Sequence, residues 1–211
     1  ETVSVSVSPY TINGPADNGS AVILELLIKE RPFIIDSLTE YLHDKQYQLS
    51  LMTYPVLSID TSDHKEIRGI GYGTEETDTN FVYCCCVIDN VDQDTIPVLK
   101  NDVKALLETV CCVTDDFGLI TKAVEEYSVK DSENESESLM ESERLRLFTW
   151  FNSGNVILLG AGELAKEDAT PELTWDKIQK PLGSVRRKKD LADLELPVEI
   201  GRLGSYFLES G

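Results

Sequence analysis

Basic residues are scarce in this sequence, with 19 lysines and arginines against 38 aspartates and glutamates, which gives a formal net charge of -19. Such a charge repels polyphosphate backbones and anionic lipid surfaces. The one basic run, Arg186-Arg187-Lys188-Lys189, is short, and we interpret it as solvated surface in preference to an anion site. We therefore expect neither nucleic acid nor a membrane as a partner.

Long hydrophobic runs are also missing. The longest nearly continuous one, residues 21–28, contains Glu25 and is far shorter than the roughly 20 residues of a membrane helix. Residues 1–8 alternate polar and apolar side chains as a strand does, without the basic start and apolar core of a signal peptide. We expect a soluble, cytoplasmic protein. Because the sequence begins without Met, we also expect it to be a piece of a longer chain.

The sequence has only two histidines and five cysteines, residue types on which many catalytic and zinc sites depend. His43 is predicted on a helix surface and His64 in a polar loop, and no serine or cysteine motif accompanies either. The cysteines form two runs, at 84–86 and 111–112, without the gap of about two to four residues that zinc ligands require. The sequence thus predicts no catalytic residue and no metal site, and it favours reduced cysteines of which 84 and 86 share a buried face.

Strand and helix patterns alternate along the first 130 residues, starting with a strand at 1–8. Residues 21–28 predict a buried strand, and Pro32 is expected at the first position of a helix over 32–45. A strand over 47–59, broken at Pro55, leads through a hairpin at 61–79 to a returning strand at 81–88. Two separate helices are predicted at 94–110 and 113–127, the second capped by Thr114.

The rest of the chain is predicted to be a second, smaller α/β part. Residues 131–138 are acidic and predict a solvated linker between domains at 1–130 and 139–211. A helix from Ser138 to a stop near Gly154 should follow, and then a short buried strand at 156–159.

Gly160 and Gly162 lie in a G-x-G-x-x-A motif after an apolar run, the pattern of a turn that binds a dinucleotide pyrophosphate. Pro171 would cut the following helix short, and no good strand precedes Asp176. Dinucleotide binding at Gly160 and Gly162 is therefore an alternative that we keep but do not favour.

The turn at residues 30–36 is a better candidate site. A strand end here meets a helix N-terminus, whose free amides suit a carboxylate, and Arg31 could add a bidentate contact. We predict an amino-acid ligand, whereas the opposing interpretation is that Pro32 and Phe33 only fix the entry into the helix. The candidate ligand-binding residues are Glu30, Arg31, Pro32, Phe33 and Asp36.

The element order predicts an α+β fold, an ACT-like (ferredoxin-like) βαββαβ sandwich once a final strand is supplied, with additional helices and the C-terminal α/β extension. Four segments then resemble, in order, landmarks in the N-terminal region of large NAD-dependent glutamate dehydrogenases. They are residues 30–37 (Glu-Arg-Pro-Phe-Ile-Ile-Asp-Ser), 54–57 (Tyr-Pro-Val-Leu), 147–160 and 181–183 (Pro-Leu-Gly). The family usually has His at the position of Tyr54.

This resemblance implies a regulatory segment without catalytic residues or a cofactor of its own. The glutamate-oxidising site and the NAD fold are then expected C-terminal to residue 211. The expected partners are an amino-acid effector, other domains of the same parent chain and further copies in a homo-oligomer. Two hypotheses stay open, an amino-acid sensor at residues 30–36 and an assembly module without a small-molecule ligand.

Overall fold

The computed structural model describes residues 3–10, 21–61, 67–72, 80–132, 146–147, 149–164 and 178–187. The chain divides into two compact units, Glu1–Val110 (unit 1) and Cys111–Gly211 (unit 2). The division falls inside the helix Ile96–Ser132. The acidic linker predicted at residues 131–138 lies mostly outside the described residues.

An antiparallel six-stranded sheet forms the described framework of unit 1, with the strand order β1-β2-β6-β4-β5 and β3 also paired with β6. β2 and β6 are its long central strands. Both are rich in apolar residues, and the sequence predicted both as strands. The strands are β1 (Val3–Tyr10), β2 (Ala21–Lys29), β3 (Gln48–Thr53), β4 (Val56–Thr61), β5 (Ile67–Tyr72) and β6 (Asn80–Asp89).

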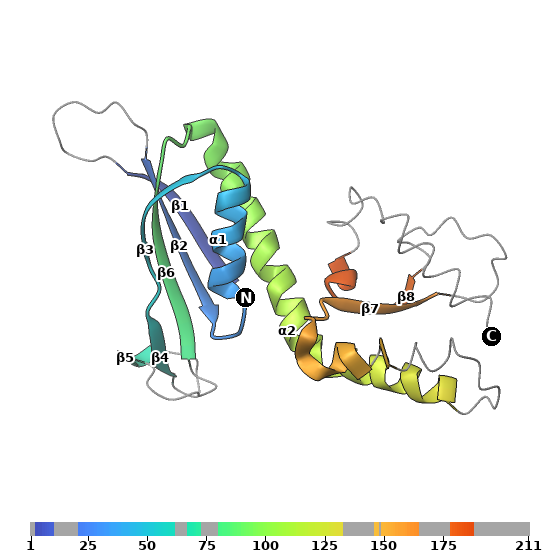
Figure 1. Ribbon diagram of the computed structural model, residues 1–211. Helices are drawn as coiled ribbons and strands as arrows, with labels where there is room; N and C mark the ends of the chain where they lie inside the picture. Colours follow the sequence, from blue (N-terminus) through green and yellow to red (C-terminus); the bar gives the residue numbers. More distant parts are fainter. Residues whose placement is uncertain are drawn as a thin grey trace. The chain divides into compact units, whose positions relative to one another are not determined.

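Helices α1 (Ile34–Asp44) and α2 (Ile96–Ser132) follow β2 and β6, and in unit 1 both lie on the same side of the sheet (Figure 1). Every second residue of the central strands faces these helices, which gives the strands their alternating burial. The core between sheet and helices is aliphatic, with Leu24, Leu26, Ile28, Leu38, Leu42, Ile88, Leu99 and Leu107 at most 2% exposed.

The predicted mixed α/β class with an antiparallel sheet is confirmed, but the strand order differs from the expected one. The expected fold needed a final strand after its second helix to fill the edge beside β2. In the structure the first strand takes that edge, because β1 pairs with β2 from Val3 opposite Ile28 to Tyr10 opposite Ala21. The alternating segment at the start of the sequence therefore supplies the edge strand of the sheet.

The break predicted at Pro55 is present. Proline has no backbone N–H and cannot donate to a strand ladder. β3 ends at Thr53 and β4 starts at Val56, and both pair with β6. The carbonyl of Pro55 still accepts a hydrogen bond from the Tyr83 amide at 3.1 Å, which keeps the break against the sheet.

One long helix replaces the two that the sequence predicted. α2 runs without interruption from Ile96 to Ser132, over 37 residues. Thr114 does not cap a new helix, since its hydroxyl donates within α2 to the carbonyl of Cys111 at 3.2 Å. Gly118 lies inside the helix, exposed, so the destabilisation of about 1 kcal/mol expected for an internal glycine is tolerated.

Unit 2 contains the second half of α2, the π-helical turn η2 (Phe151–Asn155), strands β7 (Gly160–Leu164) and β8 (Ile178–Gly183), and the 3-10 helix η4 (Ser184–Arg187). The helix stop predicted near Gly154 is confirmed, because Gly154 has φ 80° there. Residues 156–159 are not the predicted strand; the strand begins at Gly160. The predicted capping box at Ser138 lies outside the described residues.

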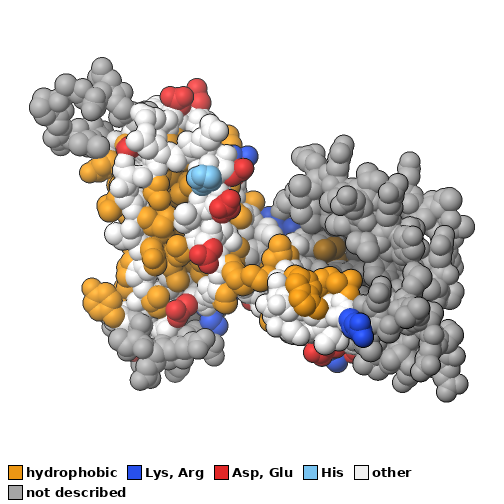
Figure 2. Space-filling view, viewed as in Figure 1, with side chains coloured by type: hydrophobic (Ala, Val, Ile, Leu, Met, Phe, Trp, Pro, Cys, Tyr) orange, Lys and Arg blue, Asp and Glu red, His pale blue; other side chains and the backbone are white. Residues whose placement is uncertain are grey.

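Hydrophobic side chains are exposed on the described surface of both units, and few lysine or arginine side chains (blue) are visible on the face shown (Figure 2). Examples are Leu51, Tyr54, Ile70, Tyr72, Phe117, Leu119, Trp150, Ile157 and Leu159, each about half exposed or more. None of the described helices is long and apolar enough to span a membrane.

Candidate functional site

The turn between β2 and α1 brings together the five residues that the sequence selected. Glu30 follows the last residue of β2 and is exposed, as are Pro32 and Asp36. Arg31 and Phe33 are partly buried. The turn lies next to the start of β6, because β2 and β6 are paired up to Lys29 and Phe81.

Asn80, the first residue of β6, fixes Glu30 in place. The Glu30 amide donates to the Asn80 carbonyl at 2.9 Å, and the Asn80 Nδ2 donates to Glu30 Oε2 at 3.0 Å. Asn80 is only 2% exposed, so this amide is a rigid donor. The sequence did not indicate Asn80, because a contact between residues 50 positions apart has no local signal.

Helix α1 begins later than predicted. Ile34 is its first residue and Phe33 its N-cap, so Pro32 precedes the helix and does not occupy its first position. Phe33 has φ 68° and ψ 4°, a left-handed conformation that is uncommon for a bulky residue. The strain of a single such residue is on the order of 1–3 kcal/mol and must be offset by its surroundings.

The N-terminus of α1 is left without a side-chain cap. Phe33 makes no capping hydrogen bond, and the first backbone bond of the helix runs from the Ser37 amide to the Phe33 carbonyl at 3.1 Å. A helix N-terminus carries a partial positive charge and unsatisfied amide donors. Asp36 in the first turn complements this charge, while the first amides still point out of the helix end.

Two kinds of electrostatic environment therefore meet at this turn. The end of α1 offers amide donors suited to a carboxylate, and the anchored carboxylate of Glu30 offers acceptors suited to an ammonium group. A simple anion would be repelled by Glu30 and Asp36, whereas a zwitterion can satisfy both parts.

The α/β unit is similar to a known domain family. The family model described as "Glutamate dehydrogenase, ACT1 domain" matches residues 3–103. This stretch is similar to the ACT1 domain of glutamate dehydrogenases. The match begins at the first residue of β1, so the edge strand beside β2 lies within the matched region. Neither curated proteins nor solved structures give a match.

The dinucleotide motif has a different geometry from the one that its sequence suggested. Gly160 and Gly162 lie within β7, which pairs antiparallel with β8 from Gly160 opposite Gly183. A pyrophosphate-binding turn connects a strand to a helix N-terminus. Gly160 and Gly162 lie instead in an antiparallel strand pair outside residues 3–103, and a Cβ on Gly160 would lie 2.9 Å from the Leu182 carbonyl oxygen.

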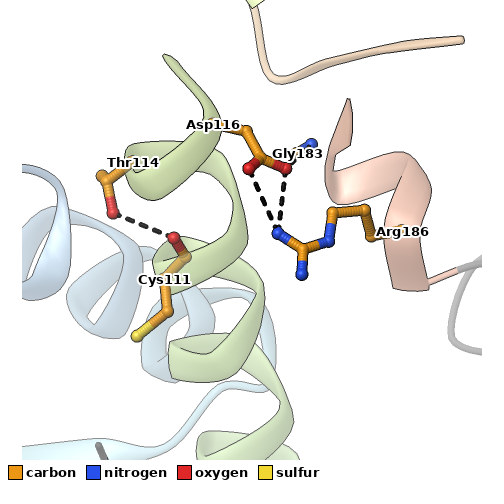
Figure 3. A network of polar contacts seen from close by, with 5 residues as sticks. All are labelled: Cys111, Thr114, Asp116, Gly183 and Arg186. Atoms are coloured by element: carbon orange, nitrogen blue, oxygen red, sulfur yellow. Dashed lines mark hydrogen bonds and ion pairs between the residues drawn. The ribbon is translucent and has the colours of Figure 1, made fainter. Parts of the chain in front are cut away.

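Asp116 forms a polar network inside unit 2 (Figure 3). This residue of α2 is 7% exposed; its Oδ2 accepts from the Gly183 amide at 2.8 Å, and both oxygens accept from Arg186 Nη1 at 3.1 Å. The ion pair raises the pKa of Arg186. Arg186 therefore supports the β7–β8 strand pair against α2. Lys188 and Lys189 of the basic run lie outside the described residues.

The cysteines of β6 are structural. Cys84 and Cys86 are fully buried on the helix side of the sheet with their Sγ atoms 3.6 Å apart, and Cys85 lies on the opposite side, as predicted. The contact with Cys84 and burial raise the pKa of the Cys86 thiol, so it stays protonated. Within the described residues no group of histidine, cysteine and acidic side chains is arranged to hold a metal ion.

Proposed function

We propose that the ACT1 domain is the amino-acid-sensing, non-catalytic part of an NAD-dependent glutamate dehydrogenase. The catalytic reaction of the parent enzyme would be the oxidative deamination of glutamate to 2-oxoglutarate, with NAD bound outside residues 1–211. The observation that supports sensing is that one turn contains both a fixed carboxylate, that of Glu30, and the uncapped N-terminus of α1.

In this proposal the effector is a free amino acid that binds as a zwitterion. Its ammonium group pairs with Glu30, and its carboxylate accepts hydrogen bonds from the first amides of α1 with support from Arg31. Phe33, which has a left-handed conformation, lies between Glu30 and the first turn of α1. Binding would change the packing of the turn against neighbouring domains and so regulate the enzyme.

A thermal-shift screen of this chain against the twenty amino acids tests the proposal. A ligand that binds only the folded state stabilises it by about 2.7 kcal/mol at a hundredfold excess over Kd, which corresponds to a rise in Tm of several degrees. We expect one or a few amino acids to give such a rise. A flat screen at millimolar ligand would refute sensing by this chain.

Two variants locate the site. Arg31→Ala and Glu30→Gln should remove the rise in Tm with the effector. Asp44→Asn is the matched control, because Asp44 is an exposed carboxylate at the other end of α1. Loss of the response in all three variants would indicate general electrostatics and contradict a site at the turn.

A second candidate function is assembly without a small-molecule ligand. β5 lies at one edge of the sheet, and its Ile70 and Tyr72 are 62% and 81% exposed. Exposed apolar edge strands pair readily with other chains. Light scattering across concentrations tests this function: a homo-oligomer that Tyr72→Lys dissociates supports it, and a monomer at all concentrations excludes self-assembly.

A further inference from the structure

The face of the sheet that points away from α1 and α2 is also apolar at its centre. In β2 and β6 the residues on this face alternate with the buried core residues, so both faces of the two central strands carry hydrophobic side chains. An antiparallel sheet with one solvated face normally alternates apolar and polar residues. The central strands thus have the composition of strands covered on both sides.

These side chains form a continuous strip along the sheet, which we call the open strip. Strand register places partners of the two central strands side by side, such as Ile23 opposite Val87 and Leu27 opposite Tyr83. Leu51 and Leu57 extend the strip onto β3 and β4, since they stand opposite Val87 and Phe81. The open strip consists of Ile23, Glu25, Leu27, Leu51, Leu57, Phe81, Tyr83, Cys85 and Val87, all partly or largely exposed.

A polar border limits the open strip along β1. Ser4, Ser6 and Ser8 of β1 stand opposite Leu27, Glu25 and Ile23. On the other side Thr53 of β3 stands opposite Cys85, while Tyr72 of β5 continues the apolar surface opposite Leu57. An apolar centre with a polar rim is the anatomy of a protein interface, whereas evenly solvated surfaces lack this separation.

Glu25 lies in the middle of the open strip and determines what can cover it. Its Oε1 accepts a hydrogen bond from the Tyr83 hydroxyl at 2.6 Å, and a carboxylate has capacity for further donors. Any apolar cover would remove water from Glu25, and a buried carboxylate is stable only when it is paired. The covering partner must therefore bring a cationic side chain.

The dimensions of the strip favour a helix. Strands are spaced about 4.8 Å apart, so two to three strands give a width of about 10–14 Å, close to the 10–12 Å diameter of an α-helix. A second copy of this chain is disfavoured, because it would bring a second Glu25 carboxylate and a further net charge of -19 to the interface.

We propose that the open strip is the docking surface for an amphipathic helix whose apolar face carries one lysine or arginine positioned to pair with Glu25. This surface lies on the sheet and is separate from the turn proposed for the effector. Its test therefore does not depend on whether an amino acid binds at residues 30–36.

The probe is a synthetic 18-residue helix with leucines on one face, a single lysine at the centre of that face and uncharged polar residues elsewhere. A control peptide has glutamate in place of the lysine. Binding of each labelled peptide to the full 211-residue chain is measured by fluorescence anisotropy. We expect the lysine peptide to bind and the glutamate peptide to bind at least tenfold more weakly.

Two charge variants of the chain are compared. Glu25→Gln should weaken binding of the lysine peptide about tenfold, the size of one charge-assisted hydrogen bond. Glu40→Gln makes the same change on the exposed surface of α1, on the helix side of the sheet, and should leave the affinity within twofold. Leu51→Ser should also weaken binding, and because Leu51 is 53% exposed this variant should fold normally by circular dichroism.

Several results would overturn the proposal. Absence of binding by the lysine peptide would remove the docking surface. Equal binding of the two peptides, or equal losses in Glu25→Gln and Glu40→Gln, would show attraction by the overall negative charge alone. A chain dimer that dissociates in Leu51→Ser and excludes the peptide would identify a second copy as the occupant.

Discussion

The hydrogen bond between Tyr83 and Glu25 is a residue-scale feature with a pH signature. The contact with Glu25 and burial raise the pKa of Tyr83 from 10.0 to about 12. A group whose pKa is raised on folding stabilises the fold fully below its unfolded pKa, and this contribution is lost as pH rises through the folded value. The contribution of the Tyr83 hydroxyl to the free energy of unfolding is therefore fully present below pH about 10 and is lost as the pH rises toward about 12.

Tyr83→Phe should lower the free energy of unfolding by about 1 kcal/mol at pH 8, and the difference from the original protein should shrink above pH 10. Urea unfolding at pH 8, 9.5 and 11 measures this. Tyr72→Phe is the control, because Tyr72 is 81% exposed and should give a pH-independent, near-zero difference. A difference for Tyr83→Phe that stays constant to pH 11 would contradict the assigned role of its hydroxyl.

Asp116 and Arg186 should be energetically coupled. The Asp116 side chain is 10% exposed and that of Arg186 50%, so the pair is less screened by water than a surface pair. A double-mutant cycle with Asp116→Ala and Arg186→Ala should give a coupling of about 1 kcal/mol. The exposed pair Lys122–Glu126, with N and O 3.5 Å apart, is the control, and its coupling should not exceed about 0.5 kcal/mol.

Chemical denaturation of the four proteins in each cycle supplies these values. Asp116→Ala should be the most destabilising single change, since it also removes the acceptor of the Gly183 amide. Faster hydrogen exchange of that amide would confirm the contact. Equal coupling in the two cycles would mean that the network contributes no more than an ordinary surface ion pair.

At the scale of elements, two glycines of unit 2 have opposite roles. Gly183, between β8 and η4, has φ 59°, and a Cβ there would collide with the Leu159 carbonyl and lie 2.9 Å from Ile120 Cδ1. Gly118, inside α2, has nothing within 4 Å of an added Cβ. The end of β8 therefore needs Gly183 for its backbone conformation and close packing, whereas α2 does not need Gly118.

Gly183→Ala should destabilise unit 2 by at least about 1–3 kcal/mol, while Gly118→Ala should stabilise the protein by about 0.5–1 kcal/mol. Thermal unfolding followed by circular dichroism distinguishes the two signs. A stabilising effect of Gly183→Ala would show that the turn between β8 and η4 relaxes more easily than its geometry indicates.

Element boundaries show where local sequence signals succeed. Pro55 removes a backbone donor, and the strand breaks there; Gly154 permits a positive φ, and the helix stops there. The start of a second helix predicted at Thr114 is wrong. A threonine inside a helix can donate its hydroxyl to a backbone carbonyl of the preceding turn, as Thr114 does to Cys111. Packing of Val113 and Ile120 then favours one continuous α2 over a new helix start.

For the whole molecule, the excess of acidic residues gives a measurable prediction. A net charge of -19 on 211 residues causes self-repulsion in the folded state, which salt screens over a Debye length of about 10 Å at 0.1 M. Tm should rise by a few degrees between 20 and 500 mM NaCl. Choline chloride should have the same effect, whereas a response to sodium alone would indicate a specific ion site instead.

The sequence by itself determined the features that depend on neighbours along the chain. Alternating polar and apolar residues predicted strands, and apolar residues at a 3.6-residue period predicted α1 and the apolar face of α2. The order of the short landmarks indicated similarity to the glutamate dehydrogenase ACT region. The turn at residues 30–36 was also visible, because a strand end, a proline and a helix start are local signals.

Only the tertiary structure decided which distant segments meet. It placed β1 on the edge where a final strand was expected, joined Asn80 to Glu30, and set Asp116 against Gly183 and Arg186. Many segments of suitable composition could form strand hydrogen bonds or buried carboxylate contacts with one another. Packing of the core determines which of these pairings forms. The open strip arises in the same way, since strand pairing alone brings Glu25 and Tyr83 together on one face.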